Sequence, residues 1–127
     1  MGTQAWSLEP VEAATQLPAN RQAPGLARSF LWTTAVRDTL PPEMETATLL
    51  VSEVVSNAVH SGAPDAPISL TCRVDSETLR AAVRNRGPRF DARDAARAGH
   101  GLRLVSGLAR RWGARPIEGG MEVWFEV

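Results

Sequence analysis

The spacing of hydrophobic residues predicts a helix in the middle of the chain. Between residues 43 and 60 the apolar positions recur at steps of three and four, at Ala47, Leu50, Val51, Val54, Val55 and Ala58. Valine is common in strands, but this period is near 3.6 rather than two, as on one face of a helix. The opposite stripe is small, polar and nearly uncharged: Ser52, Glu53, Ser56, Asn57 and His60. Such a stripe is more typical of a cleft lining than of a solvated helix face.

Alternating apolar and polar positions predict the strands. The alternation runs through residues 68–74, through the strand that begins at Leu79, and through residues 121–127. Two further strands are expected near residues 11–17 and 114–118. Short loops join these strands as hairpins, at Asp75-Ser76-Glu77 and at Glu118-Gly119-Gly120.

Two more helices complete the expected fold. Residues 22–39 place Leu26, Phe30, Leu31 and Ala35 on one face, and residues 101–112 place Leu102, Val105, Leu108, Ala109 and Trp112 inward. Strands with one apolar face, and helices gathered on that face, predict an α/β (α+β) two-layer sandwich with a mixed, mostly antiparallel sheet. The length of 127 residues fits one domain over residues 1–127, with residues 1–14 as a flexible or edge-strand N-terminus.

The composition excludes several kinds of chemistry. All 14 basic residues are arginine, which excludes a Walker A P-loop, a eukaryotic-type kinase lysine and Schiff-base catalysis. Cys72 is the only cysteine, so no internal disulfide or cysteine-built zinc site is possible, and its position predicts an inert core residue. His60 and His100 are too few for a histidine-built metal centre. No apolar run approaches the length of a membrane span and no secretory signal is found, so a cytoplasmic protein is expected.

The formal net charge is zero, yet the two signs are separated along the chain. Residues 1–79 hold four arginines and nine acids, residues 80–115 ten arginines and two acids, and residues 116–127 three acids. The local balances are therefore −5, +8 and −3. The basic segment points to an anionic ligand, a nucleic acid or an acidic partner protein, or else is a solvated arginine surface.

Three small groups of residues could carry chemistry. Glu53 and Asn57 lie four residues apart on one helical face, where they could hold Mg²⁺, although a solvated pair is the common alternative. Asn85 continues the apolar face of its strand. Its side-chain amide could pair with the edge of a purine, or the residue could simply begin the turn before Gly87 and Pro88. Gly99-His100-Gly101 opens a helix, where a backbone can approach phosphate, although loop glycines are common.

Taken together, these segments resemble the GHKL ATPases, specifically the stand-alone histidine-kinase-like ATPase domains of anti-sigma-factor serine kinases. Glu53-Val-Val-Ser-Asn57 resembles their N box, Asn85-Arg-Gly87-Pro88 their first glycine box, and Gly99-His100-Gly101-Leu102 their second. Residues 110–113 and 119–125 resemble their usual close. The likeness covers roughly residues 15–127, and the joint order is much more specific than any one segment.

The resemblance implies a Bergerat-type ATP-binding fold with ATP and Mg²⁺ as cofactors. Asn57 is expected to hold Mg²⁺ against the nucleotide phosphates, Glu53 to orient or deprotonate the attacking hydroxyl, and Asn85 to face adenine. The other nucleotide-binding residues that the resemblance implies, around the cleft and its lid, are Gly87, Gly99, His100, Gly101 and Leu102. Phosphoryl transfer needs chiefly positioning and charge neutralisation, so the missing lysine does not exclude a kinase of this kind.

The implied partners are proteins. A serine or threonine of a small anti-sigma antagonist would accept the phosphoryl group, and a sigma factor would be held or released. Relatives commonly dimerise, so a homodimer is also expected. Direct nucleic-acid binding is not expected, because residues 80–100 offer only Phe90 as a stacking surface. No membrane partner is expected.

Three departures from the family pattern support an alternative function. Asn85 stands where the family has Asp, so adenine binding is expected to lose a charge-assisted hydrogen bond. The loop of residues 88–98 is short for a lid, and Met121 stands where many relatives have Lys. The alternative is a catalytically weak or inactive switch module that binds partner proteins. Intact Glu53 and Asn57 favour the kinase.

Overall fold

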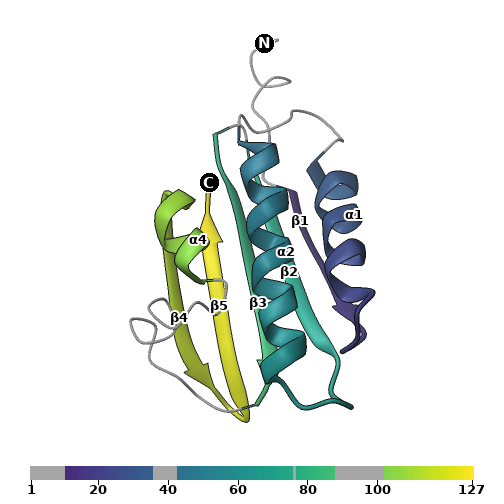
Figure 1. Cartoon of the computed structure of the whole chain (residues 1–127). Helices are drawn as coiled ribbons and strands as arrows, with labels where there is room; N and C mark the ends of the chain where they lie inside the picture. The colour runs from purple at the N-terminus through teal and green to yellow at the C-terminus, as the bar shows by residue number, and fades with distance from the viewer. Residues whose placement is uncertain (1–10, 36–42, 76, 88–101) are drawn as a thin grey trace.

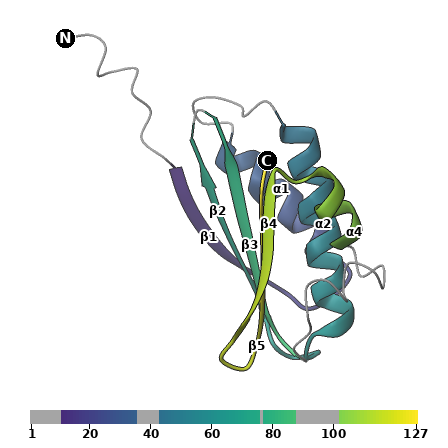
Figure 2. The ribbon, with the colours of Figure 1, turned by 90° about the vertical axis from the view of Figure 1, so that its left-hand side faces the viewer.

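The computed structural model describes residues 11–35, 43–75, 77–87 and 102–127, which form a two-layer α+β sandwich. In chain order the elements are β1 (Val11–Leu17), α1 (Ala23–Ala35), α2 (Met44–Ser61), β2 (Ile68–Val74), β3 (Leu79–Arg86), α4 (Leu102–Leu108), β4 (Arg111–Ile117) and β5 (Gly120–Glu126). The strands form one sheet in the order β1-β2-β3-β5-β4, and the three described helices cover the same face of it (Figures 1 and 2). The expected sandwich is confirmed.

The sheet is antiparallel at every pairing between described strands, rather than mixed. β2 and β3 form the expected hairpin. Its loop is stabilised by Asp75, whose Oδ1 accepts hydrogen bonds from the backbone N–H groups of Glu77 and Thr78 at 2.9 and 2.8 Å. These two bonds lower the pKa of the Asp75 carboxyl, since they stabilise its charged form.

The core lies between α2 and the inner faces of the central strands. The α2 residues that the periodicity placed inward are all buried, and so are the apolar inward residues of β2, β3 and β5, with Phe125 among the largest of them. Cys72 is buried in this core, as predicted, and burial raises the pKa of its thiol to about 12. A thiol held protonated in this way is a poor nucleophile.

α1 begins at a turn and buries a different face from the one expected. Asn20 Oδ1 accepts the backbone N–H of Gln22 at 2.8 Å, and Pro24 lies in the first turn, where its missing N–H is not needed. The buried row repeats every four residues, at Ala23, Ala27, Leu31 and Ala35. Leu26, expected inward, is 45% exposed, because it lies outside this row, and Phe30 is only partly buried. Residues 36–39 of the expected helix lie outside the described residues.

α4 is shorter than predicted because the chain pairs with β5 instead of continuing the helix. The backbone N–H of Arg110 donates to the carbonyl oxygen of Glu126 at 2.8 Å, and Trp112 pairs with Phe125 in the β4–β5 ladder. β4 therefore starts at residue 111, within the expected helix, and Trp112 contacts the core as a strand residue. Leu108, expected inward, is 49% exposed at the end of α4.

Candidate nucleotide site

The polar stripe of α2 contains a carboxylate and an amide, on Glu53 and Asn57, that the helix itself does not use. The hydroxyls of Thr48, Ser52 and Ser61 each donate to the carbonyl oxygen four residues earlier, at 2.8, 2.9 and 2.6 Å. Glu53 and Asn57 are partly buried, and their side chains have no hydrogen-bond partner within the described residues. A carboxylate and an amide are thus left free to bind a ligand.

Both of these side chains face away from α1. Nη1 of Arg28, on α1, donates to Oγ of Ser52 at 3.0 Å, which marks the side of α2 that faces α1. Glu53 and Asn57 follow Ser52 by one and five residues, so they are rotated from it by about 100° and 140° around the helix. That rotation turns them past the solvent side and toward α4, which flanks α2 on the side opposite to α1 (Figure 1).

Asn85 lies on the helix side of the sheet, as the alternation in β3 predicted. Its Nδ2 donates two long hydrogen bonds, each of 3.5 Å, to the carbonyl oxygens of Ala58 and Arg86. Ala58 directly follows Asn57 in α2, so the fold brings Asn85 to the same end of the helix. With Nδ2 engaged by the protein, Oδ1 is the atom left to accept a hydrogen bond from an adenine amino group.

Three glycines make room around Asn85. An added Cβ at Gly62 would lie 2.7 Å from Nδ2 of Asn85 and 2.6 Å from the carbonyl oxygen of Ala58. Gly87 has a φ of +157°, which side-chain-bearing residues rarely adopt, and an added Cβ there would lie 2.9 Å from the carbonyl oxygen of Ser61. An added Cβ at Gly120 would overlap the carbonyl oxygen of Asn85. The backbone approaches closely from α2, β3 and β5 at this point.

Of these glycines, sequence reasoning identified only Gly87 as part of the site. The sequence pattern gave Gly62 no role in the site, and it placed Gly120 in a hairpin turn and in the closing segment that resembles the family. The register of β3 and β5, which pairs Asn85 with Met121, explains why both matter. Met121 is buried beside Asn85, on the same side of the sheet, and gives the site an apolar wall. The residues adjacent to Gly62 or Gly120 in the sequence do not reveal the role of either glycine in the site, because the contacts join segments that are distant in sequence.

The second glycine box is described only at its end. Gly99, His100 and Gly101 lie outside the described residues. Leu102, the first residue of α4, is fully buried, so its side chain belongs to the core, and a ligand could meet only its backbone.

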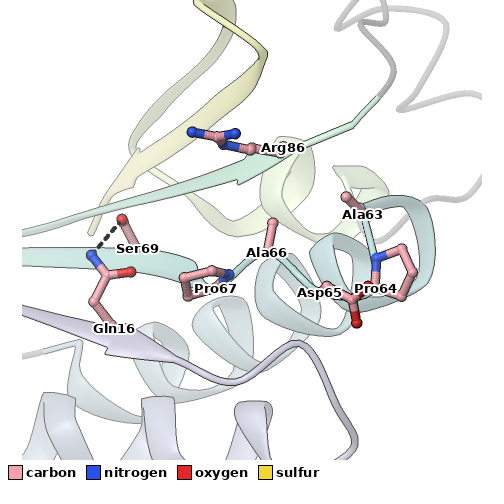
Figure 3. A pocket seen from close by; sticks show the side chains of 8 residues that line it. All are labelled: Gln16, Ala63, Pro64, Asp65, Ala66, Pro67, Ser69 and Arg86. Atoms are coloured by element: carbon pink, nitrogen blue, oxygen red, sulfur yellow. Dashed lines mark hydrogen bonds between the residues drawn. The ribbon is translucent and has the colours of Figure 1, made fainter.

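A cavity of about 590 Å³ near this end of the sheet belongs to the opposite face (Figure 3). Its wall includes Gln16, Ser69 and Arg86, together with the loop of residues 63–67. Gln16 Nε2 donates to Ser69 Oγ at 2.9 Å across the β1–β2 pair. Since Asn85 and Arg86 are consecutive in β3, their side chains point to opposite faces. The cavity therefore opens on the face of the sheet opposite to the Asn85 side chain.

Within the described residues, no group of three or more His, Cys, Asp or Glu side chains is arranged to hold a metal ion. No helix in the same part of the chain is both long and apolar enough to cross a membrane. A metal at Asn57 would therefore take its remaining ligands from a bound anion and from water.

Comparison with known proteins identifies the domain. A family model described as a histidine kinase-like ATPase domain matches residues 16–127, which is most of the chain. No curated protein matches.

Proposed function

This chain belongs to the family of histidine kinase-like ATPase domains, and we propose that it is an ATP- and Mg²⁺-binding regulator with serine/threonine kinase activity of the anti-sigma type. Its acceptor would be a hydroxyl of an anti-sigma antagonist, and a sigma factor would be its second protein partner. The family match supports the ATP-binding part. The resemblance of its motifs to those of the anti-sigma kinases supports the rest.

One observation carries the proposal within the described residues. Three of the hydroxyls along α2 are bonded to the helix backbone, whereas the side chains of Glu53 and Asn57 have no partner within the described residues. Neither side chain has a buried polar atom without a partner, so their polar atoms reach solvent and are accessible to a ligand. This carboxylate and this amide are the groups that a phosphoryl-transfer site needs.

The residues present fit the cofactors. ATP supplies the phosphoryl group, and Mg²⁺ neutralises charge on its phosphates. The Asn57 side-chain oxygen suits Mg²⁺, a hard cation that takes few protein ligands. Glu53 lies one helical turn earlier on the same face, where its carboxylate can orient a hydroxyl and accept its proton. Asn85 offers Oδ1 to the amino group of adenine, beside the apolar side chain of Met121.

Two features favour the second candidate, a switch module with weak nucleotide binding. Asn85 carries no charge, so its hydrogen bond to adenine is weaker than that of a carboxylate. Met121, which stands in place of a Lys, is 1% exposed and offers no cation to the site. Under this alternative the chain binds protein partners but transfers no phosphoryl group.

Calorimetric titration with ATP and ADP, each with and without Mg²⁺, tests the proposal. The wild type is expected to bind both nucleotides, more tightly with Mg²⁺. Asn57→Ala is expected to lose the Mg²⁺ dependence, while Ser56→Ala, one residue away on the same stripe, retains it. Absence of binding at millimolar nucleotide would refute the ATP-binding proposal. Binding without transfer of labelled phosphate to candidate antagonists encoded nearby would instead support the switch module.

A further inference from the structure

The sheet face turned away from the helices contains a buried carboxylate held by two arginines. Glu122 on β5 is 4% exposed, although no described helix covers this face (Figure 2). Its Oε2 accepts from Nε of Arg84 on β3 at 2.6 Å, and its Oε1 accepts from Nε of Arg115 on β4 at 2.8 Å. The guanidinium groups thus cover the carboxylate from both neighbouring strands.

The same arrangement repeats four residues further along β5. Glu126 is 8% exposed and accepts hydrogen bonds from Arg80 at 2.8 Å and from Arg111 at 2.8 Å. Trp124 lies between the two glutamates, with the guanidinium carbon of Arg80 4.0 Å from the centre of its ring. An added Cβ at Gly113 would lie 2.7 Å from the indole nitrogen, so the indole lies across β4 at this glycine.

We call this surface the arginine face, defined by Arg80, Arg84, Arg111 and Arg115 around Glu122 and Glu126. Four guanidinium groups surround two carboxylates, so the face has an excess of two positive charges. The glutamate side chains are 6% and 10% exposed, whereas the arginine side chains are 43% to 70% exposed. The solvent-exposed surface is therefore formed by guanidinium groups, and the carboxylates lie beneath them.

The arginines of this face retain unused hydrogen-bond donors. Arg84 and Arg115 bind their glutamate through Nε alone, so their terminal nitrogens are unused within the described residues. Arg80 uses only Nη1. The glutamates hold these long side chains in place, which lowers the conformational entropy that a ligand must remove on binding.

A pocket of about 340 Å³ lies at one end of the arginine face, where the β2–β3 hairpin meets the start of β4. Two further arginines, Arg73 and Arg110, line it beside Arg80 and Arg111. Both are exposed, and neither guanidinium group has a hydrogen-bond or ion-pair partner within the described residues, although the charge of Arg73 helps to lower the pKa of the nearby Asp75 carboxyl. Of the acidic groups in the lining, Asp75 is bonded to its own turn and Glu126 to its arginines, which leaves Glu77.

We propose that the arginine face and this pocket bind an acidic segment of a partner protein. Carboxylates of Asp or Glu side chains enter the pocket between Arg73 and Arg110, and the segment continues over the unused guanidinium donors. Arginine binds carboxylates in a planar, two-pronged geometry, and interfaces are enriched in arginine and tryptophan. The proposal is independent of nucleotide binding, because α2 lies on the other side of the sheet (Figure 2).

Two other occupants fit this face less well. A second copy docked face to face would set one positive surface against another, which opposes association. A single-stranded nucleic acid held through its bases would need free aromatic surfaces for stacking. In the described part of the face, Trp124 is the aromatic side chain, and Arg80 lies over its ring.

Fluorescence anisotropy with a labelled peptide of alternating Glu and Ala tests the proposal on the full chain. A peptide of alternating Gln and Ala is the matched probe without charge. We expect saturable binding of the acidic peptide only, weakening as salt is added. Arg73→Gln and Arg110→Gln are each expected to weaken binding by about fivefold, whereas Arg21→Gln, which removes one exposed charge elsewhere, changes it less than twofold.

The variants break no hydrogen-bonded ion pair of the described residues, and Arg73→Gln removes only an exposed attraction to Asp75, so their thermal unfolding should stay close to that of the wild type and a binding loss can be read directly. No binding of the acidic peptide overturns the proposal, as does equal weakening by Arg21→Gln. Tighter binding of an oligothymidylate than of the peptide would assign the face to nucleic acid. Sedimentation that shows a dimer dissociated by Arg73→Gln, without peptide binding, would assign it to a second copy.

Discussion

Nε of Arg84 lies 2.6 Å from Oε2 of Glu122, across neighbouring strands of the sheet face that the helices leave open. The carboxylate is almost fully buried, and Arg115 holds it from the other side at 2.8 Å. A buried carboxylate without partners is strongly unfavourable. This face of the sheet therefore depends on ion pairs where the other face depends on apolar packing.

Replacing Glu122 by Gln should destabilise the fold. Arg84 and Arg115 lose a charged hydrogen-bond acceptor. The N–H groups of the new amide also face the N–H groups of an arginine, and two donors cannot bond to each other. Because both arginines are about half exposed to water, we expect a loss of only about 1–2 kcal/mol in the free energy of unfolding. Urea denaturation measures it. Glu12→Gln, on the exposed edge strand β1, is the control and should stay within about 0.5 kcal/mol of the wild type. Equal effects of the two changes would contradict the structural role of Glu122.

The same ion pairs make stability depend on pH. Burial raises the pKa of Glu122, but the hydrogen bonds and charges of Arg115 and Arg84 outweigh it and leave that pKa below the ordinary range. The pKa of Glu126 is lowered in the same way by its own two arginines. At acidic pH the unfolded chain therefore binds more protons than the folded one, so lowering the pH favours unfolding.

This contribution is fully present above the ordinary glutamate pKa of about 4.3 and is lost as the pH falls through the lowered values. Urea midpoints measured between neutral pH and about pH 3 should fall steadily in the acidic range. In Glu122→Gln the fall should be shallower, because one of the linked groups is gone. An unchanged slope in that variant would show that Glu122 contributes nothing to the acid sensitivity.

Gly120 should tolerate no side chain. In Gly120→Ala the new Cβ would overlap the carbonyl oxygen of Asn85 and lie 2.9 Å from Cα of Arg86, and neither backbone can move without breaking the β3–β5 ladder. We expect a loss of about 3 kcal/mol or more. Gly107→Ala is the matched control. It lies in α4 with open space around it, so the same change should stabilise by up to about 1 kcal/mol. Thermal unfolding of both variants checks the contrast.

Asn85→Asp should change stability and nucleotide binding in opposite directions. Without Nδ2, a carboxylate oxygen would face the carbonyl oxygens of Ala58 and Arg86, so we expect the free chain to lose about 1 kcal/mol. The other carboxylate oxygen would offer adenine a charged acceptor, so ATP should bind more tightly. Unfolding and calorimetric titration measure the two effects. Unchanged or weaker ATP binding would refute the assignment of Asn85 to the adenine.

Glu53→Gln should separate binding from transfer. The amide keeps the shape of Glu53 but cannot accept the proton of an attacking hydroxyl. We expect ATP affinity within about threefold of the wild type and transfer to a serine acceptor reduced by about a hundredfold or more. Single-turnover transfer of labelled phosphate measures the second quantity. Equal transfer by both proteins would remove Glu53 from the chemistry.

Much of the fold could be predicted from local pattern. The strands near residues 11–17 and 68–74 and the helix of residues 43–60 were found to within one residue, because amphipathic period is a property of neighbouring positions. Prediction failed where a long-range contact competed with that period. The expected helix of residues 101–112 stops at Leu108, since β5 offers backbone hydrogen bonds to the chain that follows.

The site was predictable in its residue types but not in its surroundings. The position of Asn85 on the inner face follows from alternation alone. The need for glycine at positions 62 and 120 does not, because it arises where α2, β3 and β5 meet. Gly99, His100 and Gly101 lie outside the described residues, so their roles stay predictions.

By itself, the sequence determined the periods of the elements, the buried face of α2 and the place of Glu53 and Asn57 on its polar stripe. Only the tertiary structure decided the strand order β1-β2-β3-β5-β4. That order is what allows Arg84 and Arg115 to form ion pairs with Glu122 from the two neighbouring strands. The physical reason is that helical and strand periods are set by adjacent residues. Strand order and ion-pair partners depend instead on the closure of the whole sheet against its helices.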